Sequence, residues 1–163
     1  MTFLPFETIV IETALTKEET ISNLIRNIEP EKTFRFFNKS DTKDFEGKLR
    51  GNEFEIKRII NYQNSFLPII RGRVETIATG TRITINMRLH ALVIIFMAVW
   101  FSFIGLFFII DLSSEDSSET LLFPLGMLLF GYVLTMAGYL FESYRTKEIL
   151  TDITKGQINS NAR

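Results

Sequence analysis

The chain holds few side chains that could carry out acid–base or nucleophilic chemistry. It has one histidine, His90, and no cysteine, so thiol chemistry and a multi-histidine metal site are excluded. No hydroxyl residue is grouped with a base and an orienting acid, and no glycine-rich phosphate loop is present. We therefore expect a protein that is not an enzyme and that uses no cofactor and no metal.

Three acids, Glu46, Glu53 and Glu55, lie close enough in the sequence to suggest an acid–base pair. They occupy hairpin positions that alternate outward beside basic residues, so cross-strand ion pairs account for them without any catalysis. The basic neighbours are Lys48, Arg50 and Lys57.

The apolar residues are concentrated in one part of the chain. Mean hydropathy is positive although 23% of the 163 residues are charged, and no Lys or Arg occurs between residues 89 and 144. This region contains two uncharged runs, residues 91–110 and 121–141. At about 1.5 Å per residue, each run is long enough as a helix to cross a hydrocarbon core of about 30 Å. We predict a transmembrane hairpin over residues 91–141.

The charges around the hairpin predict its orientation. Residues 111–120, which connect the runs, carry four acids and no base, whereas Arg82, Arg88, Arg145 and Lys147 flank the outer ends. Basic loops stay in the cytoplasm. We expect a multi-pass protein of the inner cell membrane, with the acidic loop outside, both termini cytoplasmic and residues 142–163 forming a cytoplasmic tail. His90 is interpreted as an amphipathic residue at the membrane boundary, and a proton-linked or headgroup contact is the alternative.

Residues 1–90 predict a cytoplasmic α+β domain. Thr16 and Glu19 have capping-box spacing, and an apolar stripe follows over a helix at 17–29 that Pro30 ends. Alternating patterns indicate an antiparallel, curved sheet that grips this one amphipathic helix, and the last strand leads almost directly into the first span. The expected strands cover residues 6–13, 33–38, 45–50, 54–62, 68–77 and 81–89.

This order of one strand, a capped helix and a run of hairpins resembles the START-like, helix-grip superfamily. The chain departs from that pattern because it lacks the soluble C-terminal helix that closes the family's cavity, and the hairpin stands in its place. The motif Phe54-x-Ile56-x-Arg58, continued through residues 59–68, is similar to small uncharacterised bacterial membrane proteins with the same layout. That similarity covers about residues 45–110 and implies no activity.

Two sets of residues are candidates for recognition. The basic residues Arg71, Arg73, Arg82 and Arg88 predict a contact with anionic lipid headgroups rather than with nucleic acid, because the chain is tethered to a membrane. A solvated basic face is the alternative. The loop Asn64-Ser65-Phe66-Leu67-Pro68 either touches lipid or a partner through its apolar residues, or folds them back into the core.

The leading hypothesis is a non-enzymatic, membrane-anchored module. It presents its α+β domain at the inner membrane surface to membrane lipids, to a protein partner or to further copies of the chain. The alternative hypothesis is a START-like domain that binds a lipid or another apolar ligand in a cavity under the helix. The phenylalanines that would line this cavity are Phe34, Phe36, Phe37, Phe45, Phe54 and Phe66.

Overall fold

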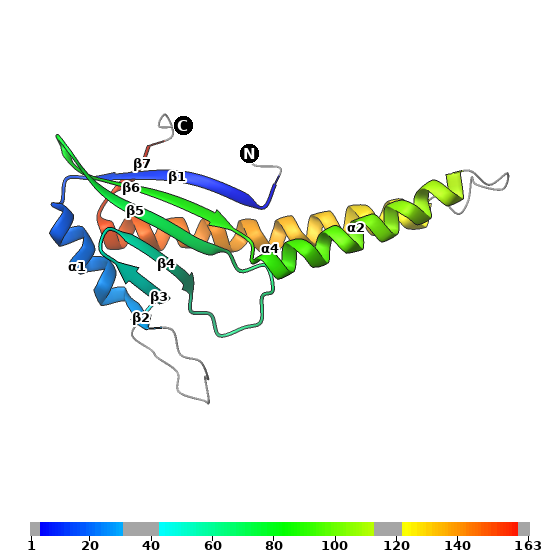
Figure 1. Ribbon diagram of the computed structural model, residues 1–163, viewed down its shortest axis with the longest axis horizontal. Coiled ribbons are helices and arrows are strands. Elements are labelled where there is room, and N and C mark those ends of the chain that lie inside the picture. The colour runs from blue at the N-terminus through cyan, green and yellow to red at the C-terminus, as the bar shows by residue number, and fades with distance from the viewer. Residues whose placement is uncertain (1–3, 31–42, 113–121, 160–163) are drawn as a thin grey trace.

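The computed structural model describes residues 4–30, 43–112 and 122–159. They form an α+β domain with a seven-stranded mixed sheet, followed by two long apolar helices that extend away from it (Figure 1). The expected strand at 33–38 and most of the acidic loop, residues 113–120, lie outside the described residues. The strands are β1 (Phe6–Thr13), β2 (Ile28–Pro30), β3 (Phe45–Arg50), β4 (Glu53–Arg58), β5 (Ile69–Ile77), β6 (Gly80–Arg88) and β7 (Gln157–Ile158).

The sheet has the order β2-β3-β4-β5-β6-β1-β7. Every neighbouring pair is antiparallel except β2 and β3, which are parallel. The sheet is therefore mixed, whereas the sequence predicted an antiparallel one. The difference arises where α1 (Lys17–Asn27) ends, because Pro30 disfavours a helical residue before it. Ile28 is already extended, so residues 28–30 pair with β3 instead of completing the predicted helix.

The inner face of the sheet carries the core. Alternate residues on five strands point to this face and are 0–7% exposed, and Leu24 of α1 packs against them. The capping box predicted for α1 is confirmed, because the Thr16 hydroxyl accepts the Glu19 N–H and the Glu19 carboxylate accepts the Thr16 N–H. The core strand residues are Ile9, Ile11, Phe45, Phe54, Ile56, Ile70, Val74, Ile83, Ile85 and Met87.

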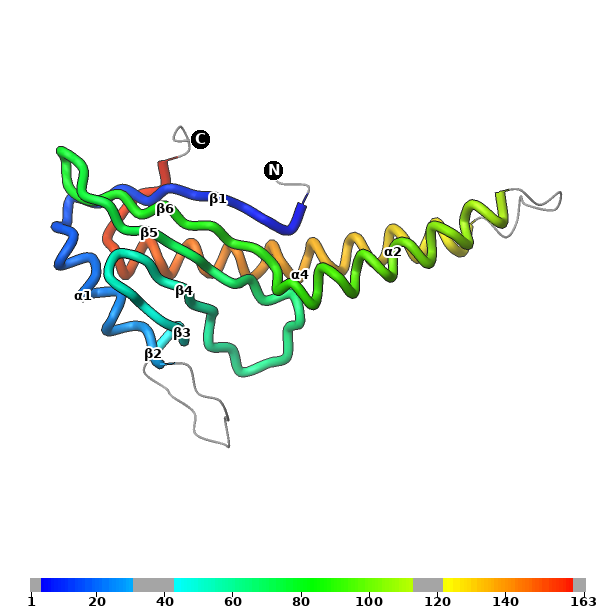
Figure 2. The backbone as a smooth tube through the Cα atoms, in the orientation of Figure 1, coloured from blue at the N-terminus to red at the C-terminus, as the bar shows by residue number. Residues whose placement is uncertain are grey.

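Helix α4 (Leu122–Thr154) differs most from the sequence expectation. It is one helix of 33 residues, and its second half lies along the inner face of the sheet (Figures 1 and 2). Residues 142–154 are therefore part of the packed domain and not a separate tail, and Leu150 is fully buried in the core. The structure thus packs a helix from the C-terminal part of the chain on the sheet, where the sequence predicted a separate tail. Its buried side is polar at Glu142, Ser143 and Thr146, whereas further along the helix the apolar side formed by Ile149, Leu150 and Ile153 packs on the core.

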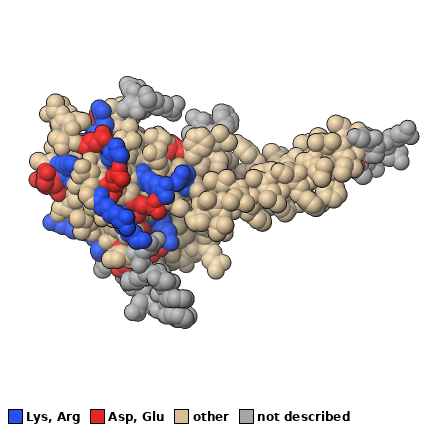
Figure 3. All heavy atoms as spheres, viewed as in Figure 1, with Lys and Arg blue, Asp and Glu red and all other residues tan. Residues whose placement is uncertain are grey.

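Helices α2 (Ala91–Leu112) and α4 pack together as a hairpin. Gly131 allows close approach, because a Cβ there would lie 3.2 Å from Nε1 of Trp100. Both helices are long and apolar enough to cross a membrane, and only 11% and 22% of their most apolar windows are buried. A core helix of a soluble protein is mostly buried, so this broad apolar exposure is typical of lipid-facing helices. On the face seen in Figure 3, the charged side chains gather on the domain and the hairpin carries almost none.

Candidate interaction surface

The outer face of the sheet, turned away from α1 and α4, carries rows of alternating charge. One row crosses four strands through Asn86, Arg71, Glu55 and Lys48, which are paired in the sheet register. The next row runs through Thr84, Arg73, Glu53 and Arg50. We call these two rows, with Arg82, Glu12 and Glu75 beside them, the charged ladder. Basic and acidic side chains are interspersed across this face (Figure 3).

Ion pairs connect the strands within the charged ladder. Arg71 Nε lies 2.5 Å from Glu55, Arg73 Nη2 lies 2.6 Å from Glu53, and Arg82 Nη2 lies 2.8 Å from Glu12. Hydrogen bonds from Arg82 and Asn159 lower the pKa of Glu12, and the Glu53 carboxylate raises the pKa of Arg73. The Arg71 and Arg73 pairs are more than half exposed, where such pairs stabilise a fold very little. They fix the pattern of charge that the face presents.

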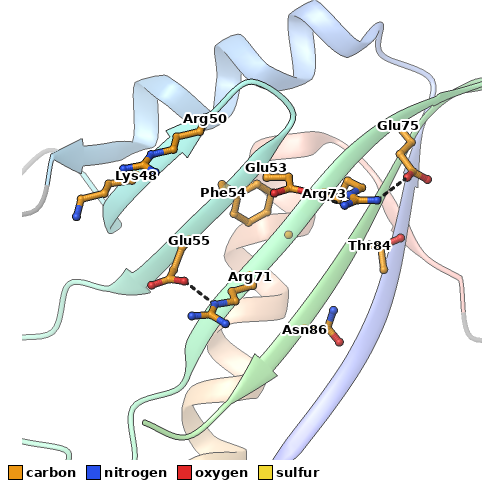
Figure 4. Close-up of a pocket in the computed structure, with 11 residues that line it drawn as sticks. Lys48, Arg50, Glu53, Phe54, Glu55, Arg71, Arg73, Glu75, Thr84 and Asn86 are labelled. Atoms are coloured by element: carbon orange, nitrogen blue, oxygen red, sulfur yellow. Dashed lines mark hydrogen bonds and ion pairs between the residues drawn. The ribbon is translucent and has the colours of Figure 1, made fainter. Parts of the chain in front are cut away.

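A hollow of about 800 Å³ lies within the charged ladder (Figure 4). Its rim is charged, and Gly72, Thr84 and Asn86 contribute small side chains or none. Gly72 stands opposite Phe54 in the register, and a Cβ at Gly72 would lie 2.1 Å from the Phe54 ring. The Phe54 ring therefore fills the space on the core side of the sheet where a side chain at Gly72 would lie.

The four arginines predicted to contact lipid do not share one environment. Arg71, Arg73 and Arg82 lie in the charged ladder and are each paired with a carboxylate, whereas Arg88 ends β6 beside the start of α2. The strands run alongside α4, so the rows of the charged ladder cross the long axis of the molecule (Figure 1). Lipid contact by these arginines stays a prediction, and the geometry places Arg88 nearest to the hairpin.

The loop from Asn64 to Pro68 packs on α4. Asn64 Oδ1 accepts the Phe66 N–H at 2.9 Å, and the Phe66 ring lies against Gly138, where a Cβ would meet it at 2.8 Å. Pro68 is buried, Phe66 and Leu67 are half-buried and Ser65 is exposed. His90 is exposed, and its Nδ1 accepts the Leu92 N–H at 3.2 Å, which caps the first turn of α2.

A buried polar cluster at the base of the domain was missed by the sequence analysis. Glu142 has no exposed side-chain surface and is bound by Arg58 Nη1 at 2.5 Å, by Asn64 Nδ2 at 3.2 Å and by the Tyr62 hydroxyl. Burial and the hydrogen bond to Glu142 raise the pKa of Tyr62. The sequence signal that could have indicated this cluster is Glu142, an acid that directly follows the second apolar run.

The Glu142 cluster also explains why β4 is shorter than predicted. The chain pairs as far as Arg58 and then leaves the sheet, because Tyr62 and Asn64 reach across to α4. Residues 59–68 therefore form the loop between β4 and β5, and this loop packs on α4 instead of continuing the strand.

No family model, no curated protein and no solved structure matches this chain. Among residues 4–30, 43–112 and 122–159, no group of three or more His, Asp or Glu is placed to hold a metal ion. The described side chains form ion pairs, caps and core contacts, so the arrangement supports recognition and assigns no reaction.

Proposed function

We propose that this protein is a membrane-anchored module that presents the charged ladder to a protein partner at the inner membrane surface, and that it is not an enzyme. The observation that carries the proposal is the continuity of α4. Its apolar first half belongs to the hairpin and its second half is a core helix of the domain. The anchor and the displayed domain therefore move as one body.

Rigid attachment of the domain to the hairpin fixes the direction in which the outer face of the sheet points. A flexible linker would let the domain tumble at the membrane, whereas an unbroken helix packed under the sheet fixes the direction of every strand. Lys147 adds to this hold, because its Nζ lies 2.6 Å from Glu7 of β1. The charged ladder accordingly faces along the membrane plane, where a neighbouring protein is the nearest partner.

The charge pattern favours a protein over a lipid surface. The hollow is lined by Lys48, Arg50, Arg71 and Arg73 and by Glu53, Glu55 and Glu75, so bases and acids nearly balance. Anionic lipid attracts a cluster of bases, while alternating signs favour a partner with a complementary alternating pattern. A protein surface can supply that pattern, and it includes the surface of another copy of this chain.

Binding of an apolar ligand inside the domain is the less supported function. The expected cavity would lie between α1 and the sheet, and Phe45 and Phe54, which would line it, are 0% and 3% exposed and pack in the core. The candidates Phe34, Phe36 and Phe37 lie outside the described residues. The burial of Phe45 and Phe54 in the core supports a packed interior over a ligand cavity.

Site-specific photocrosslinking in intact cells tests the proposal. We expect p-benzoylphenylalanine at Thr84 or Asn86, inside the hollow, to give one discrete protein adduct that Arg73→Glu abolishes. The same probe at Ile25, which is 52% exposed on α1, should not give this adduct. Arg26→Glu is the matched control, because Arg26 is an exposed arginine that lies on α1, away from the hollow. Absence of an adduct from both hollow positions, or an equal adduct from Ile25, would overturn the proposal.

A further inference from the structure

One end of the domain carries nearly all of its exposed large apolar side chains. Within the described residues, and outside the stretches 91–112 and 122–138, eight large apolar residues are exposed, and six of them lie at the end where the hairpin begins. The other two are Ile25 and Ile158. We call the six the collar. They are 43–71% exposed and comprise Leu4, Phe6, Tyr62, Leu140, Phe141 and Tyr144.

The sheet register sets the level of the collar. Phe6 stands opposite Arg88, which stands opposite Ile69, and α2 begins three residues after Arg88. The start of β1, the end of β6 and the 59–68 loop thus reach the same level along the long axis (Figure 2).

Helix α4 contributes to the collar at this level too. The Tyr139 hydroxyl donates to the Met87 carbonyl at 3.1 Å, and Asn64 Nδ2 donates to the Gly138 carbonyl at 3.4 Å. Residues 138–141 are therefore the end of the apolar run and also the beginning of the domain. On the side of α4 away from these contacts, Leu140, Phe141 and Tyr144 remain exposed.

The chemistry of the collar matches one occupant. Its aromatic rings continue the apolar surface of the hairpin, and the exposed residues Arg88, His90 and Arg145 lie at the same end. Aromatic side chains beside basic ones are typical of protein surfaces at the boundary between headgroups and acyl chains. We propose that the collar is embedded in the headgroup region of the bilayer, so that the domain stands upright in contact with lipid. This inference rests on the proposed membrane anchoring.

The collar differs from the electrostatic hold predicted from the sequence. Burial of apolar rings does not depend on ionic strength, whereas attraction of arginines to anionic lipid is screened over about 3 Å at 1 M salt. The collar should therefore insert equally well into neutral and anionic bilayers.

Quenching of tryptophan fluorescence by brominated lipid tests the collar. The full chain with Trp100→Phe is reconstituted into vesicles of phosphatidylcholine brominated at shallow acyl carbons, and a single tryptophan is added. Phe6→Trp and, as an independent reporter, Tyr144→Trp probe the collar. Leu129→Trp, 63% exposed on α4, is the positive control for anchoring. Ile77→Trp, eight residues along β5 from the collar level and about 27 Å away, is the negative control.

We expect the tryptophans at 6 and 144 to lose at least about half of their emission, with the same loss at about 1 M salt. Leu129→Trp should be quenched and Ile77→Trp should not. Quenching at 129 without quenching at 6 and 144 would overturn the collar and leave the anchoring intact. Lack of quenching at 129 would overturn both. Quenching at 77 would show a domain that lies flat and would also overturn the collar.

Discussion

At the scale of single residues, Glu142 is the side chain that joins the hairpin to the domain. It has no exposed side-chain surface, and its partners Arg58, Tyr62 and Asn64 all come from the end of β4 and the loop after it. A buried ion pair adds little net stability against apolar residues of the same size, but removal of one partner leaves a buried charge unpaired. The cluster therefore specifies where the loop sits on α4.

We predict that Glu142→Ala lowers the free energy of unfolding of the detergent-solubilised chain by about 3 kcal/mol. Glu148→Ala is the matched control, because Glu148 also pairs with an arginine on α4 but is 59% exposed, and it should change stability by less than about 0.5 kcal/mol. The measurement is chemical denaturation followed by circular dichroism.

The double variant Arg58→Leu with Glu142→Leu removes both charges of the buried pair. It should recover most of the stability lost by the single variant. Equal losses for Glu142→Ala and Glu148→Ala would contradict the assignment of Glu142 as the junction.

At the scale of elements, the capped helix α1 was the most predictable part of the fold. Thr16 and Glu19 act over three residues, so their local spacing was sufficient to predict the cap. The hairpins of the sheet were predictable for the same reason, since alternation and the Gly51-Asn52 turn are local signals.

The cap makes the stability of the domain depend on pH in a defined direction. Hydrogen bonds from Thr16 lower the pKa of Glu19, so the unfolded chain binds the proton more tightly. The stabilisation is present above the ordinary carboxyl pKa of 4.5 and is lost as the pH falls through the lowered value. We predict that Glu19→Gln makes the decline of the melting temperature below pH 4.5 shallower. An unchanged acid slope would contradict the role of this carboxylate.

The second half of α4 could not be predicted from local pattern. Several of its buried residues are polar, and Tyr139 and Ser143 find partners on strands more than 50 positions away, at Met87 and at Glu7. The hydropathy pattern predicted a helix only as far as residue 141, where the apolar run ends, although α4 continues to Thr154. The charged ladder was partly predictable from alternation, but the hollow depends on the strand register, which places residues of β3, β4, β5 and β6 side by side.

We predict that Leu150→Ala lowers the free energy of unfolding by about 3 kcal/mol, because Leu150 is fully buried between α4 and the sheet. Leu134→Ala makes the same deletion at a position on α4 that is 49% exposed on the hairpin, and it should have little effect. Denaturation of the two variants in the same detergent makes the comparison. If residues 142–154 formed a separate tail, both variants would lower the free energy of unfolding equally little, and this result would contradict the packing of α4 on the sheet.

At the scale of the whole molecule, one helix makes the packed domain continuous with the apolar hairpin. The two helices expose most of their apolar surface, and the charges gather on the domain (Figure 3). Displaying a charged face to a partner requires that the hairpin crosses the membrane and that the domain stays on the cytoplasmic side. Because the chain has no cysteine, single cysteines can report the side of each position without further engineering.

The most direct measurement is labelling of single cysteines with a membrane-impermeant thiol reagent. One cysteine replaces Ser114, between the two helices, and the other replaces Thr79, exposed in the turn between β5 and β6. We predict that Ser114→Cys labels on intact cells and that Thr79→Cys labels only after permeabilisation. Labelling of both positions on intact cells, or of neither, would place them on one side of the membrane and contradict a spanning hairpin.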